Sequence, residues 1–158
     1  MKLLELYNES LAKELILMVG IPAAGKSTYI ARELSEYKII SPDSFIPYTD
    51  EEPWTPNRAK SAWAQSDMEL NNSWGKYDKI AFDATFTFPR MRKKYIEWAK
   101  DNGYKVKAIY FEISPEEAKR RNLSRAPARR VPEETIDRML SQLVPPSKSE
   151  GFDEVIKA

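Results

Sequence analysis

The chain has 158 residues, a length that suits one domain able to bury its own hydrophobic core, so we expect a single domain over residues 1–158. Its 25 basic and 24 acidic residues leave a net charge of +1, and nothing in the whole-chain charge requires nucleic acid or a membrane as partner. The absence of cysteine and histidine excludes disulfides, thiolate zinc sites and a histidine general base, so proton transfer must use a carboxylate.

The first residues predict a short amphipathic helix ahead of the first strand, because leucines between residues 3 and 13 recur at roughly helical spacing. We assign no chemistry to this segment. Its charged character is unlike that of a secretory signal, and the apolar runs are too short to cross a bilayer. We therefore expect no membrane partner and a cytoplasmic location, or the host cytoplasm if a phage encodes the protein.

The next stretch matches the phosphate-loop pattern G-x-x-x-x-G-K-[ST] at every defined position. An apolar run at residues 15–19 predicts a buried strand before it, and residues 27–37 carry apolar side chains at helical spacing. An ordinary glycine-containing turn is the alternative, and this flanking pattern counts against it. In a phosphate loop, backbone N–H groups surround phosphate oxygens, Lys26 reaches the β- and γ-phosphates, and Ser27 binds Mg²⁺. The predicted nucleotide contacts here are Gly20, Ala23, Ala24, Gly25, Lys26, Ser27 and Thr28.

Residues 38–41 predict a second short strand, and Asp43 lies just beyond its carboxyl end. In an open α/β sheet ligands bind at that edge, so Asp43 would lie near the γ-phosphate if this strand is close to the sheet centre. A Ser-Pro-Asp-Ser sequence suits a helix or turn cap equally well. The residues alone leave both interpretations open.

Residues 46–56 hold three prolines and three consecutive acids, which predicts a loop at the rim of a pocket. An imperfect amphipathic helix follows over residues 57–74, and we interpret its aromatic side chains as core rather than as base-stacking platforms. Residues 79–83 predict a buried third strand. Asp83 and Thr85 then place a second carboxylate and a hydroxyl at a strand end.

The remaining chain continues the alternation of strand and helix. We expect a helix opened by Pro89 over residues 90–102, a strand at 104–113, a helix capped by Ser114, a helix from residue 132 to about 143 and a terminal strand at 152–156. This order predicts a single-domain, three-layer P-loop NTPase fold of the α/β class, with a parallel sheet of four to five strands flanked by helices.

A basic segment between the last two predicted helices holds six cations and no anion over residues 119–130. We expect an arginine-rich lid over approximately residues 119–131, with Arg125 as its central cation and a clamp on the phosphates. For Arg120, Arg121, Arg129 and Arg130 taken singly, a solvated helix and loop face is the alternative.

These parts suit phosphoryl transfer, which requires cations on the transferred group, Mg²⁺, and a base or orienting group on the acceptor. Lys26 and the lid arginines supply cations, Ser27 a metal ligand, and Asp43 a carboxylate that can accept a hydrogen bond from an attacking alcohol. An apolar strand ending in Asp-Glu or Asp-x-x-Gly, typical of motor ATPases and signalling GTPases, does not occur in suitable context. This favours transfer to an alcohol over hydrolysis.

Taken together, the motifs resemble the bacteriophage polynucleotide kinase-like group of P-loop kinases, related to the small AAA-type ATP-binding kinases. The resemblance implies transfer of the γ-phosphate of ATP, with Mg²⁺, to the 5′-hydroxyl of DNA or RNA. It implies Asp43 as general base and Arg125 as the lid arginine on the donor phosphates, with Arg121 and Arg129 beside it. It implies Asp83 as an acceptor-side or supporting carboxylate, with Thr85 on the acceptor side. The residues that carry the resemblance are the phosphate loop, Asp43, Asp83-Ala84-Thr85, Arg121-Asn122-x-x-Arg125 and Val131-Pro132.

The sequence departs from that family at Ile46, where the phage kinase has an arginine that helps to bind the acceptor's phosphate. Two other functions therefore remain in view. One is a kinase of a small-molecule or modified-base hydroxyl, and the other is a regulatory module that binds ATP without turnover. The oligomeric state does not follow from the sequence.

Overall fold

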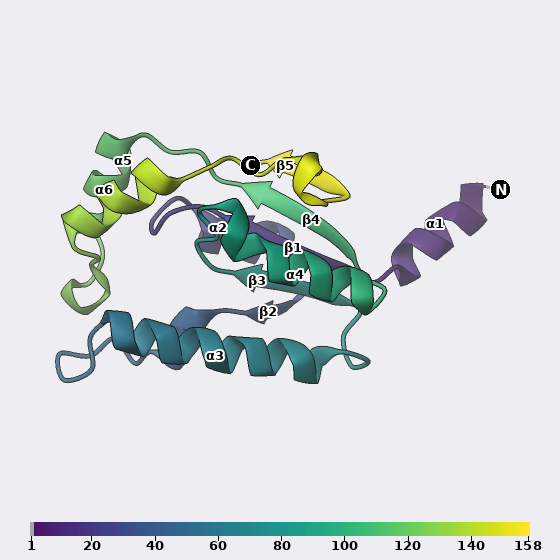
Figure 1. The fold of residues 1–158 in the computed structure, drawn as a ribbon, viewed down its shortest axis with the longest axis horizontal. Coiled ribbons are helices and arrows are strands. Elements are labelled where there is room, and N and C mark those ends of the chain that lie inside the picture. Colours follow the sequence, from purple (N-terminus) through teal and green to yellow (C-terminus); the bar gives the residue numbers. More distant parts are fainter. Residues whose placement is uncertain (1) are drawn as a thin grey trace.

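Five parallel strands form the centre of the structure, a computed structural model that describes residues 2–158 apart from the side chains of residues 8–11 (Figure 1). They are ordered β2-β3-β1-β4-β5. Because β1 lies between β3 and β4, the sheet extends in both directions from β1. The strands are β1 (Glu14–Val19), β2 (Lys38–Ile40), β3 (Lys79–Asp83), β4 (Lys105–Tyr110) and β5 (Glu154–Lys157).

The register of the strands brings the predicted chemical loops to one edge. Met18 of β1 pairs with Asp83 of β3, and Ile40 of β2 pairs with Phe82. The chain after each of these strands therefore leaves the sheet at nearly the same level. Ligands bind at this carboxyl edge in open α/β sheets.

Helices alternate with the strands as predicted, and most boundaries differ by only a few residues from those expected. Side chains of Thr55 and Ser114 cap α3 and α5 by accepting hydrogen bonds from the N–H groups of Arg58 and Glu117. The α-helices are α1 (Lys2–Leu11), α2 (Lys26–Glu33), α3 (Pro56–Ser73), α4 (Pro89–Asp101), α5 (Pro115–Leu123) and α6 (Glu133–Gln142). Short 3-10 turns are η1 (Pro42–Phe45), η2 (Pro127–Arg129) and η3 (Lys148–Glu150).

The fourth strand is shorter than the predicted residues 104–113. Tyr110 pairs with Val19 and Lys157, the last residues of β1 and β5, so no neighbouring strand continues the ladder beyond it among the described residues. Phe111 instead donates its N–H to the carbonyl of Val19 and turns away.

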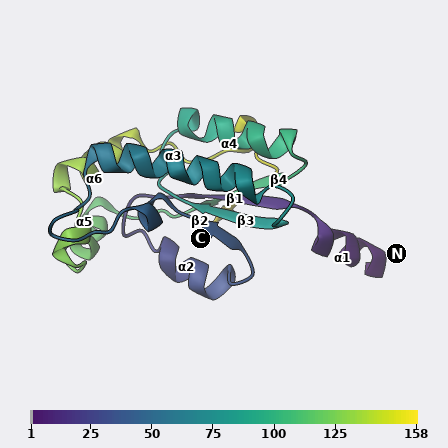
Figure 2. The same ribbon diagram turned by 90° about the horizontal axis from the view of Figure 1, so that it is seen from below.

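The two faces of the sheet carry separate hydrophobic clusters. Leu15, Leu17 and Val19 of β1 point to the face covered by α3 and α4, whereas Ile16 and Met18 point to the face covered by α2. Figure 2 shows α2 on one side of the sheet and α3 and α4 on the other. The strand alternates in this way because successive side chains leave opposite faces. The predicted three-layer α/β P-loop fold is confirmed.

The packing of α3 corrects part of the predicted apolar face. Met68 and Trp74 are exposed by 65% and 55% and do not belong to the core. The helix instead buries a stripe of mostly small side chains. This stripe consists of Ala62, Ser66, Leu70 and Ser73. Trp63, beside it, packs against Phe82 and Phe86.

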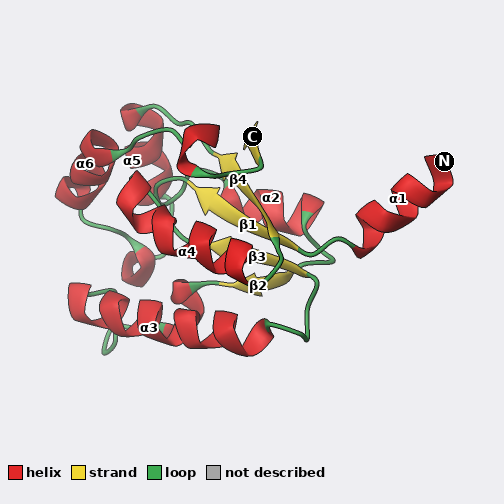
Figure 3. Ribbon diagram, turned by 45° about the vertical axis from the view of Figure 1, so that its right-hand side comes forward, coloured by secondary structure: helices red, strands yellow, loops and turns green. Residues whose placement is uncertain are grey.

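The N-terminal helix α1 forms as predicted and extends away from the sheet (Figure 3). Its residues Leu3, Leu4 and Leu6 are exposed. Among the described residues, no helix combines the length and the apolar character needed to span a bilayer.

Candidate functional site

The loop between β1 and α2 has the backbone of a phosphate-binding loop. Gly25 adopts φ +105° and Ala23 φ +66°, both in the left-handed region that turns successive N–H groups the same way. Gly20 is required for space as well. A Cβ there would lie 3.0 Å from Cβ of Phe111, just after β4. The loop thus passes directly over the end of the neighbouring strand.

Lys26 holds its ammonium group over this loop. Its Nζ donates to the carbonyl of Gly20 at 2.6 Å and to that of Ile21 at 3.3 Å. Burial lowers the pKa of Lys26, and the nearby carboxylates of Asp83 and Asp43 partly oppose this. The two carboxylates therefore only partly compensate the positive charge of Lys26, and this favours binding of an anion in front of the loop.

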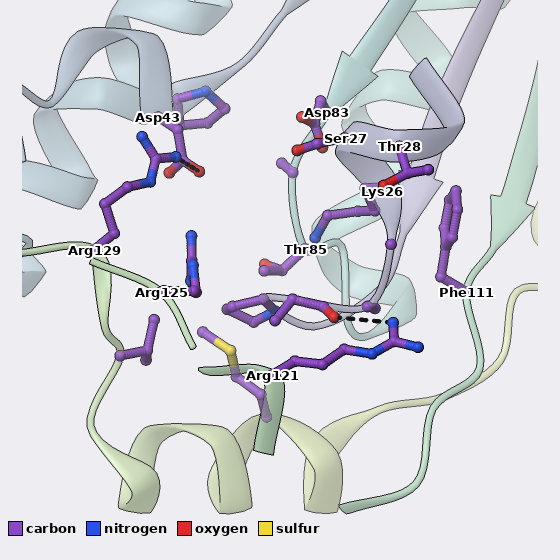
Figure 4. A pocket seen from close by; sticks show the side chains of 18 of the residues that line it. Lys26, Ser27, Thr28, Asp43, Asp83, Thr85, Phe111, Arg121, Arg125 and Arg129 are labelled. Carbon is purple, nitrogen blue, oxygen red and sulfur yellow. Dashed lines mark hydrogen bonds and ion pairs between the residues drawn. The ribbon is translucent and has the colours of Figure 1, made fainter. Parts of the chain in front are cut away.

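Asp83 at the end of β3 lies beside the start of α2. Figure 4 draws it next to Ser27, across the cavity from Asp43. Burial raises the pKa of Asp83, Lys26 opposes the rise and Asp43 adds to it. The acceptor-side or supporting role of Asp83 stays a prediction.

Asp43 lies in η1 and is contacted by two residues from other segments. The hydroxyl of Tyr48 donates to its Oδ1, and Nη2 of Arg129 lies 4.0 Å from its Oδ2. The guanidinium of Arg129 also lies over the ring of Tyr48, 4.6 Å from its centroid. The side chain is not used as a helix cap, because Ser41 is the residue at the N-cap of η1. Asp43 instead faces the cavity, and its carboxylate contacts Tyr48 of the following loop and Arg129 of the lid.

The basic segment folds as a helical hairpin whose turn is held by one buried side chain. The amide of Asn122 accepts from the N–H of Val131 at 3.0 Å and donates to its carbonyl at 2.8 Å. These two bonds close the chain between α5 and α6 and present the intervening arginines to the phosphate loop. Among the described residues, Asn122 is one of the few buried polar side chains.

The arginines of the lid differ in the contacts that they make. Arg121 donates to the carbonyl of Ala23 at 3.4 Å and pairs with Glu117, while Arg120 is exposed and pairs with the same glutamate. Arg125 is half-buried, and its Nη1 makes no hydrogen bond to any described residue. Burial and the neighbouring charge of Arg129 lower the pKa of Arg125. An unpaired, partly buried guanidinium is suited to bind an anion.

A cavity of about 760 Å³ collects these groups. All the site residues predicted from the sequence line it except Gly20, whose place is behind the loop. Figure 4 shows Asp43 and Arg129 on one side and Asp83, Ser27 and Thr28 on the other, with Lys26 and Arg125 directed into the space between them. The structure therefore brings the predicted residues together in one place, and their roles stay predictions.

Sequence reasoning did not find the roles of Tyr48 and Asn122. Tyr48 adopts φ +56°, a conformation that a residue other than glycine rarely adopts and that no sequence pattern indicated. Asn122 was part of the motif that carried the family resemblance, but its hydrogen bonds to Val131 depend on the fold of the lid. The sequence signal that could have pointed to Asn122 was an asparagine between arginines.

Comparisons with known proteins agree with this geometry. A family model described as an AAA domain matches residues 15–146. No curated protein matches the sequence. Among solved structures, the fold is similar to Kti12 of Chaetomium thermophilum in complex with ADP-AlF3, with TM-score 0.65 and 15% identity over 91% of this chain and 88% of that one.

Two further structures share the fold. A gluconokinase from Sinorhizobium meliloti 1021 aligns with TM-score 0.61 and 16% identity over 92% of this chain and 81% of that one. A chain of the Pnkp1/Rnl/Hen1 RNA repair complex aligns with TM-score 0.68 and 19% identity over 84% of this chain. This match spans 44% of that chain, so the chain corresponds to less than half of that protein.

Proposed function

The chain belongs to the AAA domain family, and from that premise we propose that it is an ATP-dependent kinase that transfers the γ-phosphate of ATP to a hydroxyl group. One observation carries the proposal: Lys26, Asp43 and Arg125, from three separate segments, line one cavity in front of the phosphate loop. Such a transfer needs a cation at the loop, a cation from a lid and a carboxylate at the far side.

The donor half of the site binds the triphosphate. Backbone N–H groups of residues 23–28 and the N-terminus of α2 face the phosphates, and Lys26 exchanges its bonds to Gly20 and Ile21 for phosphate oxygens. Arg125 pairs its free Nη1 with the donor phosphates. Arg121 and Arg129 flank the same space. The solved structure of Kti12 with ADP-AlF3, which shares the fold, supports ATP as the donor.

Asp43 acts as general base. It accepts the proton of the acceptor hydroxyl while that oxygen forms a bond to the γ-phosphorus, and the bond from this phosphorus to the β–γ bridging oxygen breaks. ADP then leaves with the electron pair of the broken bond. Lys26 and Arg125 stabilise the charge that develops on the transferred group.

The residues present also fit Mg²⁺. The hydroxyl of Ser27 and the carboxylate of Asp83 are hard oxygen ligands of the kind that this ion prefers. When bound, the ion would neutralise phosphate charge. Ser27 would hold it directly, and Asp83 would hold it directly or through water.

The 5′-hydroxyl of DNA or RNA is the acceptor that the family resemblance implies. The fold shared with a chain of an RNA repair complex is consistent with it. A small-molecule or modified-base hydroxyl is the second candidate, and one observation favours it. Ile46, buried by 95% of its surface, lines the cavity where a cation for an acceptor phosphate would be expected.

The test is incubation of the protein with γ-labelled ATP, Mg²⁺ and separate panels of 5′-hydroxyl oligonucleotides and small alcohols. We expect label in an acceptor. Label in oligonucleotides supports the first acceptor, and label only in small alcohols supports the second. Tight binding of ATP without transfer to any acceptor would contradict the kinase and favour a non-catalytic ATP-binding module.

A further inference from the structure

The cations of the cavity come from two parts of the chain. Those lining it are Lys26, Arg32, Arg121, Arg125 and Arg129. The first two belong to α2, and the other three belong to α5 and to the segment between α5 and α6. Arg129 extends from the lid toward the opposite wall, where it lies 4.0 Å from Asp43 and over the ring of Tyr48.

The opposite wall carries no cation among the described residues that line the cavity. It is formed by η1, the loop after it and the first turns of α3, and its only charged side chain is the base Asp43. The other side chains are apolar or aromatic: Pro42, Ile46, Tyr48, Trp54, Ala59 and Trp63. Just outside the cavity, residues 50–52 of the same loop are three consecutive acids.

This wall is held in place before any acceptor binds. Arg58 of α3 donates to the carbonyl of Pro53 at 2.9 Å, next to Trp54. The N–H of Thr49, next to Tyr48, donates to the carbonyl of Glu52. Arg58 is thereby used inside the loop and does not line the cavity. A braced wall of this kind presents its rings at low entropic cost to a ligand.

Two tryptophans on this wall have unused binding capacity. Trp63 stacks one face on Phe82, with centroids 5.7 Å apart, and its other neighbours leave part of the ring exposed to the cavity. Trp54 makes no ring–ring or cation–ring contact with the described residues. Neither indole N–H donates to any described residue, whereas that of Trp98 on α4 donates to Asn71. Buried or half-buried indole N–H groups usually have a partner.

On the basis of the proposed function, we propose that the acceptor is an alcohol carrying a planar ring, of nucleoside size, whose ring stacks on Trp54 while its hydroxyl faces Asp43. A ring hydrogen-bond acceptor would use the indole N–H of Trp54 or Trp63.

The experiment compares nucleosides with glycerol. Transfer of label from ATP gives kcat/KM, and calorimetry with a non-hydrolysable ATP analogue bound gives affinity without turnover. We expect nucleosides to exceed glycerol by about tenfold or more in kcat/KM, because glycerol has no ring to stack on Trp54.

Substitutions at Trp54 test whether its ring binds the nucleoside. Trp54→Leu should weaken nucleoside affinity and raise KM by about 5- to 100-fold, the range expected for one stacked base. Trp54→Phe keeps a ring and should retain most of the affinity. Trp74→Leu is the matched control, because Trp74 is exposed and does not line the cavity.

Each other outcome decides against one of the two proposals. Transfer to glycerol alone, no nucleoside binding, or an unchanged affinity in Trp54→Leu would overturn the ring subsite. Nucleoside binding that depends on Trp54 but leads to no transfer from ATP would keep the subsite and overturn the kinase. If Trp54→Leu fails to fold, the comparison of nucleosides with glycerol and the Trp54→Phe variant still decide.

Discussion

The hydroxyl of Tyr48 donates a hydrogen bond of 2.5 Å to Oδ1 of Asp43. Tyr48 has a left-handed backbone at φ +56°, and such strain persists where surrounding contacts hold it, often at functional sites. Arg129 lies over the ring of Tyr48 and approaches Oδ2 of the same carboxylate. The bond therefore orients Asp43 so that Oδ2 faces the lid and the cavity.

Tyr48→Phe tests this positioning role. Loss of a hydrogen bond to a charged group corresponds to about 1.5–3 kcal/mol, so we expect kcat to fall by about 10- to 100-fold with little change in ATP affinity. Burial and the bond to Asp43 raise the pKa of Tyr48, so its own titration should not shape the rate at neutral pH. Tyr77→Phe, at an exposed position outside the cavity, is the control. A kcat for Tyr48→Phe equal to that of the control would contradict the role.

Asp43→Asn removes the proposed base and keeps the shape of the side chain. We expect kcat to fall by about 10²–10⁴-fold, because the amide cannot accept the proton of the acceptor. ATP affinity, measured by calorimetry, should be retained. Asp50→Asn, an exposed acid of the neighbouring loop, should behave as the wild type. Intact phosphotransfer by Asp43→Asn would remove Asp43 from its assigned role.

Lys26→Ala separates catalysis from stability. Burial lowers the pKa of Lys26, so the folded protein holds this proton less tightly than the unfolded chain does, and the charge costs stability below the folded pKa. We expect the ligand-free melting temperature at neutral pH to be unchanged or higher. Activity should fall by about 10²–10³-fold, and the rise in melting temperature caused by ATP should be lost.

The matched control for that change is Lys60→Ala, an exposed lysine of α3 that does not line the cavity. It should keep both activity and the ATP-dependent rise. If Lys26→Ala retained the ATP-dependent rise in melting temperature, the lysine would not be a phosphate contact.

Asp83→Asn should change the pH dependence of stability. Burial raises the pKa of Asp83, so the stability that comes from its protonated form is complete below the unfolded pKa of about 4 and is lost as pH rises through the raised folded pKa. The asparagine variant lacks this loss and should be the more stable protein at neutral pH in chemical denaturation. A variant less stable than the wild type at neutral pH would contradict this.

The same variant should bind Mg²⁺–ATP less well. If Asp83 supports the metal beside Ser27, its loss should weaken Mg²⁺ affinity by about 10- to 100-fold, measured as the Mg²⁺ dependence of nucleotide binding. An effect only on the KM of the acceptor would instead support the acceptor-side role predicted from the sequence.

Arg92→Leu tests a buried ion pair outside the cavity. The Arg92 side chain is fully buried, pairs with Glu150 through two hydrogen bonds of 2.8 and 2.9 Å and donates to the carbonyls of Phe86 and Val144. Its loss leaves Glu150 without its ion-pair partner and the two carbonyls without this donor. We therefore expect the free energy of unfolding, measured by chemical denaturation, to fall by about 3–5 kcal/mol. Arg90→Leu, an exposed position on the same helix, should change stability by less than about 0.5 kcal/mol.

Much of the fold and the donor half of the site could be predicted because their signals are local. The spacing of Gly20, Gly25 and Lys26 lies within one strand–loop–helix unit. The third strand, Lys79–Asp83, was predicted at its observed bounds, since a short run of apolar residues bounded by turns suits a buried strand. The predicted cap, Ser114, bonds to a residue three positions away.

The face of α3 was predicted less well. Its apolar residues are imperfectly spaced, and the sequence alone could not show that a stripe of small residues would be buried while Met68 and Trp74 stay exposed. Tertiary packing decided this, because it sets which face of the helix meets the core.

By itself, the sequence determined a phosphate loop, a segment of arginines and the alternation of strand and helix that predicts a parallel α/β sheet, since each of these signals lies within a few residues. Only the tertiary structure decided which residues contact Asp43. Arg129 reaches it from 86 positions along the chain because strands β2, β3 and β1 are neighbours and the lid folds back over them. The same folding brought Trp54 and Trp63 to the cavity that the cations line. Contacts between distant segments depend on strand order, which no local pattern encodes.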